Sequence, residues 1–232
     1  MLSSLLPAIG NAQQTQPATQ LPPPIPSAPH PNVAPRFLVV LDPAHGGNNT
    51  GARITDHLLE KDITLSLAMR LRSMLSAHGI GVVTTRDSDT NPTSTNRAET
   101  ANHNPAAACI LIHATATGSG VHLYTSSLAP TALTRFPPWQ TAQSAYVTQS
   151  LKLSSDIDSA MAHAEIPVSL GRTFLQPMDS LTCPAVAVEV APLVAGGATR
   201  ATPLTDTAYQ RSILDALTAA IEEWRTDWNQ QP

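Results

Sequence analysis

The chain has 232 residues, of which 42% are hydrophobic and 13% are charged, and its formal net charge is −4. This apolar content is enough for a hydrophobic core, which excludes a wholly disordered chain. The acidic balance argues against a nucleic-acid-binding protein, which normally carries a basic surface. No run reaches about 18 uninterrupted apolar residues, so we expect no transmembrane segment.

The N-terminal part is rich in proline. Eight of the 21 prolines lie between Pro17 and Pro35, in the stretch PATQLPPPIPSAPHPNVAP. Such a run cannot pack as a helix or a central strand, and it is typical of a semi-extended, disordered linker. We therefore expect a disordered leader and linker over residues 1–35 and one folded domain over residues 36–229.

A short apolar run, residues 2–9, precedes this linker and is followed by the small residues Gly10 and Ala12. Their spacing is typical of a signal-peptidase site, so the run could be the remnant of a secretory signal. The positive n-region is missing and the run is short. A further stretch of disordered tail is the alternative.

Strand and helix signals alternate at the start of the folded part. Residues 36–42 (RFLVVLD) form a short, continuous apolar run, which is typical of a strand buried on both faces. Residues 58–79 carry leucine or isoleucine at four-residue spacing and end in glycine, which predicts a helix. Residues 80–87 predict the next strand. This order indicates a right-handed crossover and a largely parallel sheet.

The rest of the chain continues the pattern. In order, we expect a short helix over 91–104, strands over 106–116 and 120–127, a loop over 128–138, a long helix over 139–165, a strand over 184–193 and an amphipathic helix over 205–228. The stretch 128–143 either covers a cleft or loops away from it. Cys109 and Cys183 both precede apolar runs, so two buried free thiols are the first interpretation; a disulfide is the alternative if the chain is exported.

Three residues with side chains suited to catalysis or metal binding lie at the C-terminal ends of expected strands: His45, His113 and Glu189. In open α/β sheets, ligands collect at the carboxyl ends of the strands. Glu189 follows a run that should be buried, where a charge is costly unless it is paired or lies near a metal. It could therefore form a salt bridge, for instance to Arg86 or Arg172, or serve as a general base.

Two histidines and a glutamate are a common ligand set of catalytic zinc, which also needs one open position. His45 and His113 are the natural histidines, and Glu60 stands at the start of the first long helix, from where a loop could return it to the strand ends. A carboxylate in a first helical turn also interacts well with the helix dipole, which is the structural alternative for Glu60.

Five blocks in fixed order carry a resemblance that covers roughly residues 37–224: VVLDPAHGGNNTGA, EKDITLSLAMRLRSMLSAHGIGVVTTRDSD, NRAETAN, ILIHATA and PAVAVEVAPL. Together they resemble the zinc-dependent N-acetylmuramoyl-L-alanine amidases of the Amidase_3 type, which are bacterial cell-wall enzymes. The resemblance implies a three-layer α/β/α fold around a mostly parallel, mixed sheet.

The resemblance also implies roles for four residues. His45 falls on the histidine of the family's D-P-G-H-G-G block, Glu60 on the glutamate of its E-K-D block and His113 on the histidine of its S-I-H-A-N block; these are the family's Zn²⁺ ligands. Glu189 falls on its catalytic carboxylate, in P-A-V-L-V-E. The family cuts the amide between the lactyl group of N-acetylmuramic acid and L-alanine. Glu189 would take a proton from water and pass it to the alanine nitrogen.

The chain departs from the family pattern near these residues. Ala44 replaces a glycine, which could restrict the turn before His45, and Asn49 stands where an aspartate is common. Asp42 and Asn49 are candidates for orienting the histidines. His57 and His122 could touch substrate, and Tyr124 could line the cleft.

Two rival functions stay open. A different zinc peptidase on a similar fold would need arginines aimed at a terminal carboxylate, and the sequence shows no such cluster. A non-catalytic peptidoglycan-binding domain would be expected to lack a ligand or Glu189. We therefore expect a monomeric peptidoglycan amidase of the periplasm or the extracellular space, with no nucleic-acid partner.

Overall fold

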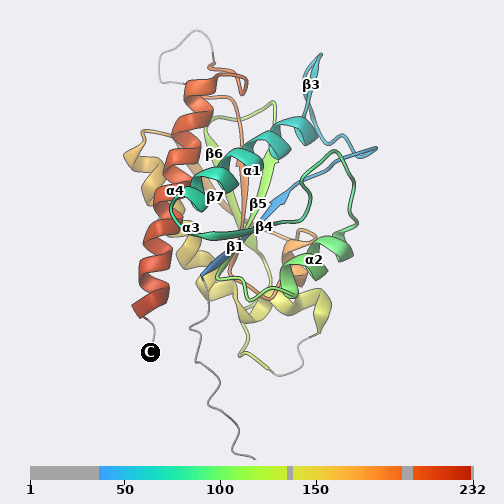
Figure 1. The fold of residues 1–232 in the computed structure, drawn as a ribbon, viewed down its shortest axis with the longest axis vertical. Coiled ribbons are helices and arrows are strands. Elements are labelled where there is room, and N and C mark those ends of the chain that lie inside the picture. The colour runs from blue at the N-terminus through green and yellow to red at the C-terminus, as the bar shows by residue number, and fades with distance from the viewer. Residues whose placement is uncertain (1–36, 135–137, 195–200, 231–232) are drawn as a thin grey trace, which may run out of the picture. The chain divides into compact units, whose positions relative to one another are not determined.

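The computed structural model describes residues 37–134, 138–194 and 201–230 (Figure 1). The expectations for residues 1–35 lie outside the described residues, as does the centre of the 128–143 stretch. None of the helices in the described part of the chain is both long and apolar enough to cross a membrane.

A six-stranded sheet in the order β4-β1-β5-β8-β6-β7 forms the centre of the domain. Its strands are β1 (Leu38–Pro43), β4 (Gly81–Thr84), β5 (Ala108–Ala114), β6 (Val121–Ser126), β7 (Val168–Thr173) and β8 (Ala185–Val190). β6 runs antiparallel to β8, and the other neighbouring pairs are parallel. The sheet is thus mixed and mostly parallel, as expected.

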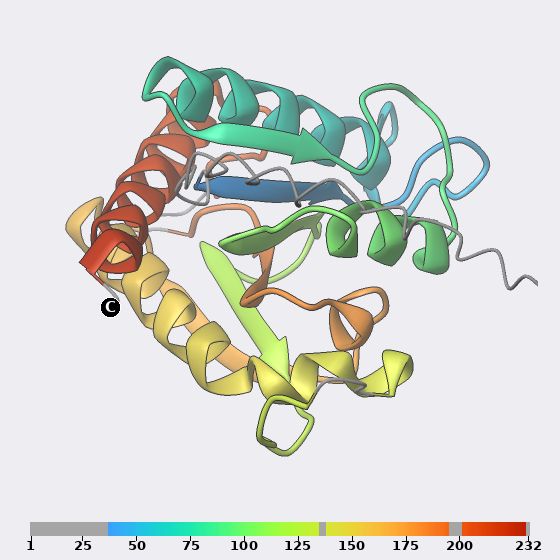
Figure 2. The ribbon, with the colours of Figure 1, turned by 60° about the horizontal axis from the view of Figure 1, so that its bottom comes forward.

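Helices cover both faces of this sheet (Figure 2). α1 (Glu60–Ala77), α3 (Val147–His163) and α4 (Thr207–Gln230) lie on one face. α2 (Ser94–Asn102) lies on the other, with the 3₁₀ segment Met178–Ser180. The α/β fold with a helical layer on each side of the sheet is therefore confirmed.

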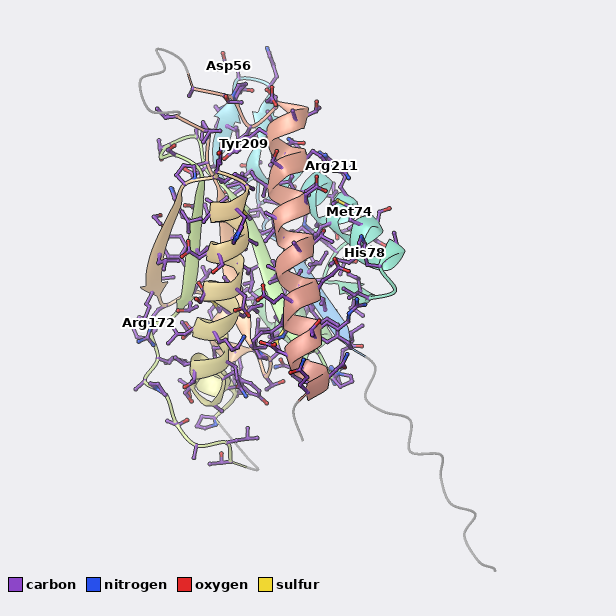
Figure 3. All side chains as sticks on the ribbon, turned by 90° about the vertical axis from the view of Figure 1, so that its left-hand side faces the viewer. Asp56, Met74, His78, Arg172, Tyr209 and Arg211 are labelled. Atoms are coloured by element: carbon purple, nitrogen blue, oxygen red, sulfur yellow. A yellow bond between two sulfur atoms is a disulfide. The ribbon has the colours of Figure 1, made fainter. Side chains whose placement is uncertain are left out.

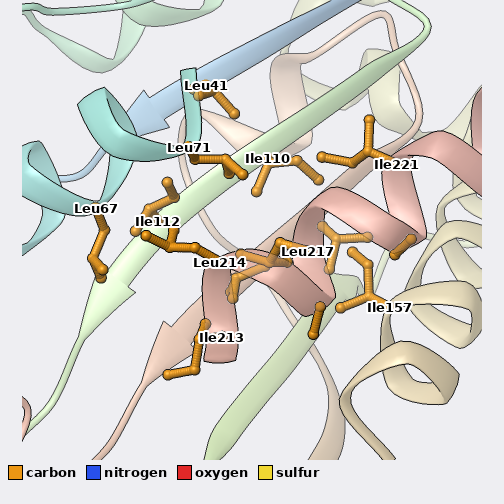
Figure 4. Packing of buried hydrophobic residues seen from close by; sticks show 14 of the residues in the cluster. Leu41, Leu67, Leu71, Ile110, Ile112, Ile157, Ile213, Leu214, Leu217 and Ile221 are labelled. Carbon is orange, nitrogen blue, oxygen red and sulfur yellow. The ribbon is translucent and has the colours of Figure 1, made fainter. Parts of the chain in front are cut away.

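The two faces have separate cores because side chains alternate along each strand. Leu41, Ile110 and Ile112 pack against α1 and α4 in the larger core (Figure 4). Their neighbours Val40 and Leu111 point the other way, into the smaller core beneath α2. Burial on both faces explains why these strands have continuous apolar sequences.

α3 and α4 lie side by side over the larger core (Figure 3). Tyr209 of α4 is buried, and its hydroxyl donates to the carbonyl oxygens of Gly120, at 3.2 Å, and Ala191, at 2.9 Å. These bonds fix α4 to the residue just before β6 and to the residue just after β8. The two strands carry His122 and Glu189, respectively.

Three elements differ from the expectations. The long helix expected over 139–165 is divided into a 3₁₀ segment, Trp139–Ala145, which is itself kinked at Thr141 (φ −130°, ψ 23°), and α3, which begins at Val147. β7 is an edge strand whose residues are half-buried or exposed, so it lacks the apolar run that marks the central strands. A small hairpin, β2 (Arg53–Thr55) with β3 (Leu58–Leu59), precedes α1.

A disulfide joins Cys109 and Cys183, whose Cα atoms are 6.1 Å apart, so the interpretation of two free thiols is wrong. Cys109 lies opposite Ala185 in the β5–β8 pair, which brings Cys183 beside it. The pairing follows from the adjacency of strands that are distant in sequence, so the cysteine positions alone could not reveal it.

Loss of this disulfide should lower stability markedly. It links residues 74 apart, and such a cross-link restricts the unfolded chain. We expect the double variant Cys109→Ala/Cys183→Ala to lose roughly 2–4 kcal/mol of unfolding free energy in urea denaturation. Wild-type protein reduced with dithiothreitol should shift in the same direction. Equal midpoints for oxidised and reduced wild type would contradict the expectation.

Candidate metal centre and its surroundings

His45, Glu60 and His113 lie together at the carboxyl edge of the sheet. His45 follows β1, Glu60 is the first residue of α1, and His113 is near the end of β5. One ligand atom from each lies within 4.8 Å of the others. Glu60 Oε2 is 3.1 Å from His45 Nε2, and Glu60 Oε1 is 3.1 Å from His113 Nδ1. The two carboxylate oxygens thus face one imidazole each.

The turn after β1 directs His45 toward this group. Positive φ falls on His45 (62°), Gly46 (133°) and Gly47 (52°), and not on Ala44. The Ala44 amide donates to the Ile112 carbonyl at 3.0 Å, so the sheet ladder continues through this residue. An alanine fits here because the unusual backbone angles begin one residue later, and the expected restriction of the turn does not arise.

The loop containing β2 and β3 leads the chain into α1 (Figure 1). Glu60, the first residue of this helix, lies 3.1 Å from the His45 ring. The Glu60 amide donates to the Ala52 carbonyl at 2.8 Å, and the Ala52 amide donates to Glu60 Oε2 at 2.8 Å. Gly51 leaves room for this contact: a Cβ atom there would lie 2.6 Å from Glu60 Oε2 and from His45 Cδ2. This arrangement places a carboxylate at the strand ends.

The electrostatics of the group favour a bound cation. Burial raises the pKa of Glu60, which is only 5% exposed, but hydrogen bonds from His113, His45 and the Ala52 amide lower it more. Its pKa therefore lies well below the usual range, and the carboxylate is charged. The hydrogen bond with Glu60 in turn raises the pKa of His45. Because each imidazole nitrogen faces a carboxylate oxygen, either protons or a metal ion must lie between them.

Asn49 fixes the form of the His45 ring that suits metal binding. Asn49 Oδ1 is 2.9 Å from His45 Nδ1 and accepts a second hydrogen bond from the Gly51 amide at 3.4 Å. An oxygen at this position calls for a proton on Nδ1, so Nε2 is the nitrogen that faces Glu60, and after loss of its own proton it can ligate a metal ion. The nitrogen, nitrogen and oxygen donors fit a catalytic zinc site with an open position.

Two buried arginines hold the chain on which His45 stands. Arg97 pairs with Asp42 at 2.6 Å and donates to the His45 carbonyl at 2.7 Å. Arg86 donates to the carbonyls of Pro43 and Ala44, each at 2.9 Å. Arg86 therefore does not pair with the nearby aspartates or Glu189. Asp42 contacts Arg97 rather than a histidine, so of the two candidates for orienting His45, only Asn49 touches its ring.

Removal of Arg97 should destabilise the domain. The Arg97 and Asp42 side chains are 6% and 7% exposed, so Arg97→Met would leave a buried carboxylate without its cation. We expect the unfolding free energy to fall by about 3–5 kcal/mol. Arg211→Met, which breaks a largely exposed pair with Asp215, is the matched control and should have no measurable effect in the same denaturation experiment. Equal stability of the Arg97 variant and wild type would contradict this assignment.

Glu189 lies beside His113 and is hydrogen-bonded to His122. In the sheet register it is opposite His113 of β5 on one side and His122 of β6 on the other. Its Oε2 is 2.7 Å from His122 Nδ1, and its side chain is 29% exposed. The suggested salt bridge to Arg172 is absent: that guanidinium donates to the Ser126 carbonyl.

Two cavities, each of about 270 Å³, share His113 in their walls. One is lined by polar residues around His45, Asn49 and Arg97. The other contains Glu189 and Tyr124. Burial, together with the charge of Glu189, raises the pKa of Tyr124, so its hydroxyl stays protonated. Tyr124 thus lines the cleft as expected, whereas His57 lies exposed between β2 and β3.

The comparisons with known proteins agree with this architecture. Residues 39–223 match the model of the Amidase_3 family, described as N-acetylmuramoyl-L-alanine amidase. The chain belongs to this family. The match runs from β1 into α4 and so includes every residue of the candidate site.

Curated members of the family share local stretches of sequence. The chain is 49% identical over 53 residues to the germination-specific N-acetylmuramoyl-L-alanine amidase of Bacillus subtilis, covering 23% of the chain and 22% of that relative. It is 42% identical over 77 residues to N-acetylmuramoyl-L-alanine amidase AmiA of Escherichia coli, covering 33% of the chain and 27% of that relative. The matched part thus spans about a quarter of these relatives.

Solved amidase structures share the fold over most of the domain. The catalytic domain of CwlV from Bacillus (Paenibacillus) polymyxa superposes with a TM-score of 0.63 at 22% identity, covering 82% of this chain and 98% of that one. Ami1 from Mycobacterium smegmatis gives a TM-score of 0.64 at 21% identity, covering 82% and 97%. At this identity, the likeness concerns the fold.

Proposed function

We propose that this chain is a zinc-dependent amidase that hydrolyses the bond between the lactyl group of N-acetylmuramic acid and L-alanine in peptidoglycan. The observation that carries the proposal is the placement of Glu189 beside the His45, Glu60 and His113 group, at one edge of the sheet. Family membership supplies the substrate class.

His45, Glu60 and His113 would hold the metal. When bound, a zinc ion supplies Lewis acidity, which polarises a carbonyl oxygen and lowers the pKa of water to about 7. Asn49 keeps the His45 ring in the ligating form, and Glu60 stays ionised. The chain therefore contributes a preformed, anionic set of donors to the site.

Glu189 would serve as the general base and then the general acid. One of its oxygens, Oε2, is held by His122, and the half-exposed side chain borders a cavity that also contains His113. It would accept a proton from the attacking water and deliver it to the departing alanine nitrogen. Water oxygen would end on the lactyl carbon, and the stem peptide would leave with a free amino terminus.

The disulfide supports a location outside the cytoplasm. Bridges such as Cys109–Cys183 form and persist in oxidising compartments, which include the periplasm and the extracellular space. Peptidoglycan lies in the same compartments. We propose that the enzyme acts there as a monomer.

Digestion of purified sacculi with zinc-loaded protein tests the proposal. Mass spectrometry should find free stem peptides that begin with L-alanine and glycan strands that carry unsubstituted muramic acid. Shortened peptides still attached to muramic acid would instead indicate a peptidase. Binding to sacculi without release of any fragment would indicate a non-catalytic domain.

A further inference from the structure

His122 contacts Glu189 across the antiparallel pair of β6 and β8. The two residues are directly opposite in the register, and His122 Nδ1 is 2.7 Å from Glu189 Oε2. The side chains are 17% and 29% exposed, so the contact is partly shielded from water. Within the described residues, no other side chain is hydrogen-bonded to Glu189.

The His122 ring is confined by the turn before β6. Gly118 lies against the imidazole edge remote from Glu189: a Cβ atom on this glycine would be 2.5 Å from Cε1 and 2.7 Å from Nε2. Gly118 also has a φ of 90°, which favours glycine. The backbone thus approaches one edge of the ring while the other edge faces the carboxylate.

We propose that His122 is a positioning residue for Glu189, an inference that rests on the proposed function. The ring donates its Nδ1–H to Oε2, which fixes the carboxylate and leaves Oε1 for the reacting water. A glutamate side chain has three rotatable bonds, so without this contact it would spend much of its time in unproductive orientations. A hydrogen bond to an ionised acceptor is strong enough to select one of them.

Two substitutions of His122 distinguish a positioning role from a role in packing alone. His122→Leu fills similar space but cannot donate, whereas His122→Asn can place an N–H near the position of Nδ1. With soluble muropeptide as substrate, we expect kcat of the leucine variant to fall by roughly 10–100-fold, with KM, zinc content and Tm unchanged. The asparagine variant should recover most of the lost kcat. His163→Asn, at an exposed position on α3, is the histidine control and should behave as wild type.

NMR of the metal-free protein gives a readout that is independent of turnover. Two-bond ¹H–¹⁵N correlations should show His122 with a proton on Nδ1 in wild type. Observation of the neutral ring with its proton only on Nε2 would overturn the inference, because Nδ1 could not then donate to Glu189.

The kinetic outcomes distinguish this inference from the proposed function. Wild-type protein that releases no stem peptide contradicts the proposed function and, with it, the role of His122. An active wild type with an equally active His122→Leu variant overturns only the positioning role. Equal losses of kcat in both variants, together with a lowered Tm, would also overturn it, because they would show that His122 serves only the packing of the strand.

Discussion

Replacement of Glu189 by glutamine is expected to lower kcat/KM for muropeptide hydrolysis by about 10²–10⁴-fold, the usual contribution of a general acid–base. Glutamine has nearly the same shape and retains an oxygen that can accept the hydrogen bond from His122. It cannot take up a proton at the operating pH. The three proposed metal ligands lie after β1, at the start of α1 and in β5 rather than on β8, so zinc content should be unchanged.

The experiment compares Glu189→Gln with Glu223→Gln, which makes the same chemical change at an exposed position of α4. Chromatography measures the release of stem peptides, and elemental mass spectrometry measures the zinc content of each variant. A Glu189 variant with full zinc and wild-type kcat/KM would remove Glu189 from the mechanism. Loss of zinc in this variant would show instead that Glu189 supports the metal site.

Replacement of His45 by alanine should remove a metal ligand and abolish hydrolysis. Substitution of residues that merely orient a ligand typically costs 10–100-fold in metal affinity, so loss of a ligand should cost more than about 100-fold. His45→Ala also leaves Glu60 with one facing imidazole rather than two. Competition with a chromophoric chelator measures the affinity.

His57→Ala is the matched control for this variant. His57 lies in the exposed turn between β2 and β3, close in sequence to Glu60 but outside the ligand group. It should bind zinc with wild-type affinity. Unchanged zinc affinity in His45→Ala would show that the metal is held elsewhere, and chelation of wild type should abolish activity that added Zn²⁺ restores.

The residues at the strand ends are the part of the site that the sequence predicts most directly. His45, His113 and Glu189 each follow a buried apolar run, and parallel strands bring such ends to one edge. The position of Glu60 was harder to predict because it depends on a hairpin and on the absence of a side chain at Gly51. The sequence left a helix-dipole role as the alternative for Glu60, and the resemblance favoured the ligand role.

His122 shows why other parts of the site could not be predicted. It stands at the start of β6, whereas Glu189 stands near the end of β8. The two residues meet because β6 is antiparallel to its neighbour β8. Nothing in the local sequence of β6 indicates this direction. The same dependence on strand adjacency conceals the disulfide between Cys109 and Cys183.

Hydrolysis in water enriched in ¹⁸O tests the central claim most directly. After digestion of sacculi and cleavage of the glycan with a muramidase, one heavy oxygen should be found in the lactyl carboxyl group of muramic acid. The released stem peptides should begin with L-alanine and carry no label. Heavy oxygen at a peptide carboxyl terminus, with muramic acid unlabelled, would contradict the assignment of this chain as an amidase of the lactyl–alanine bond.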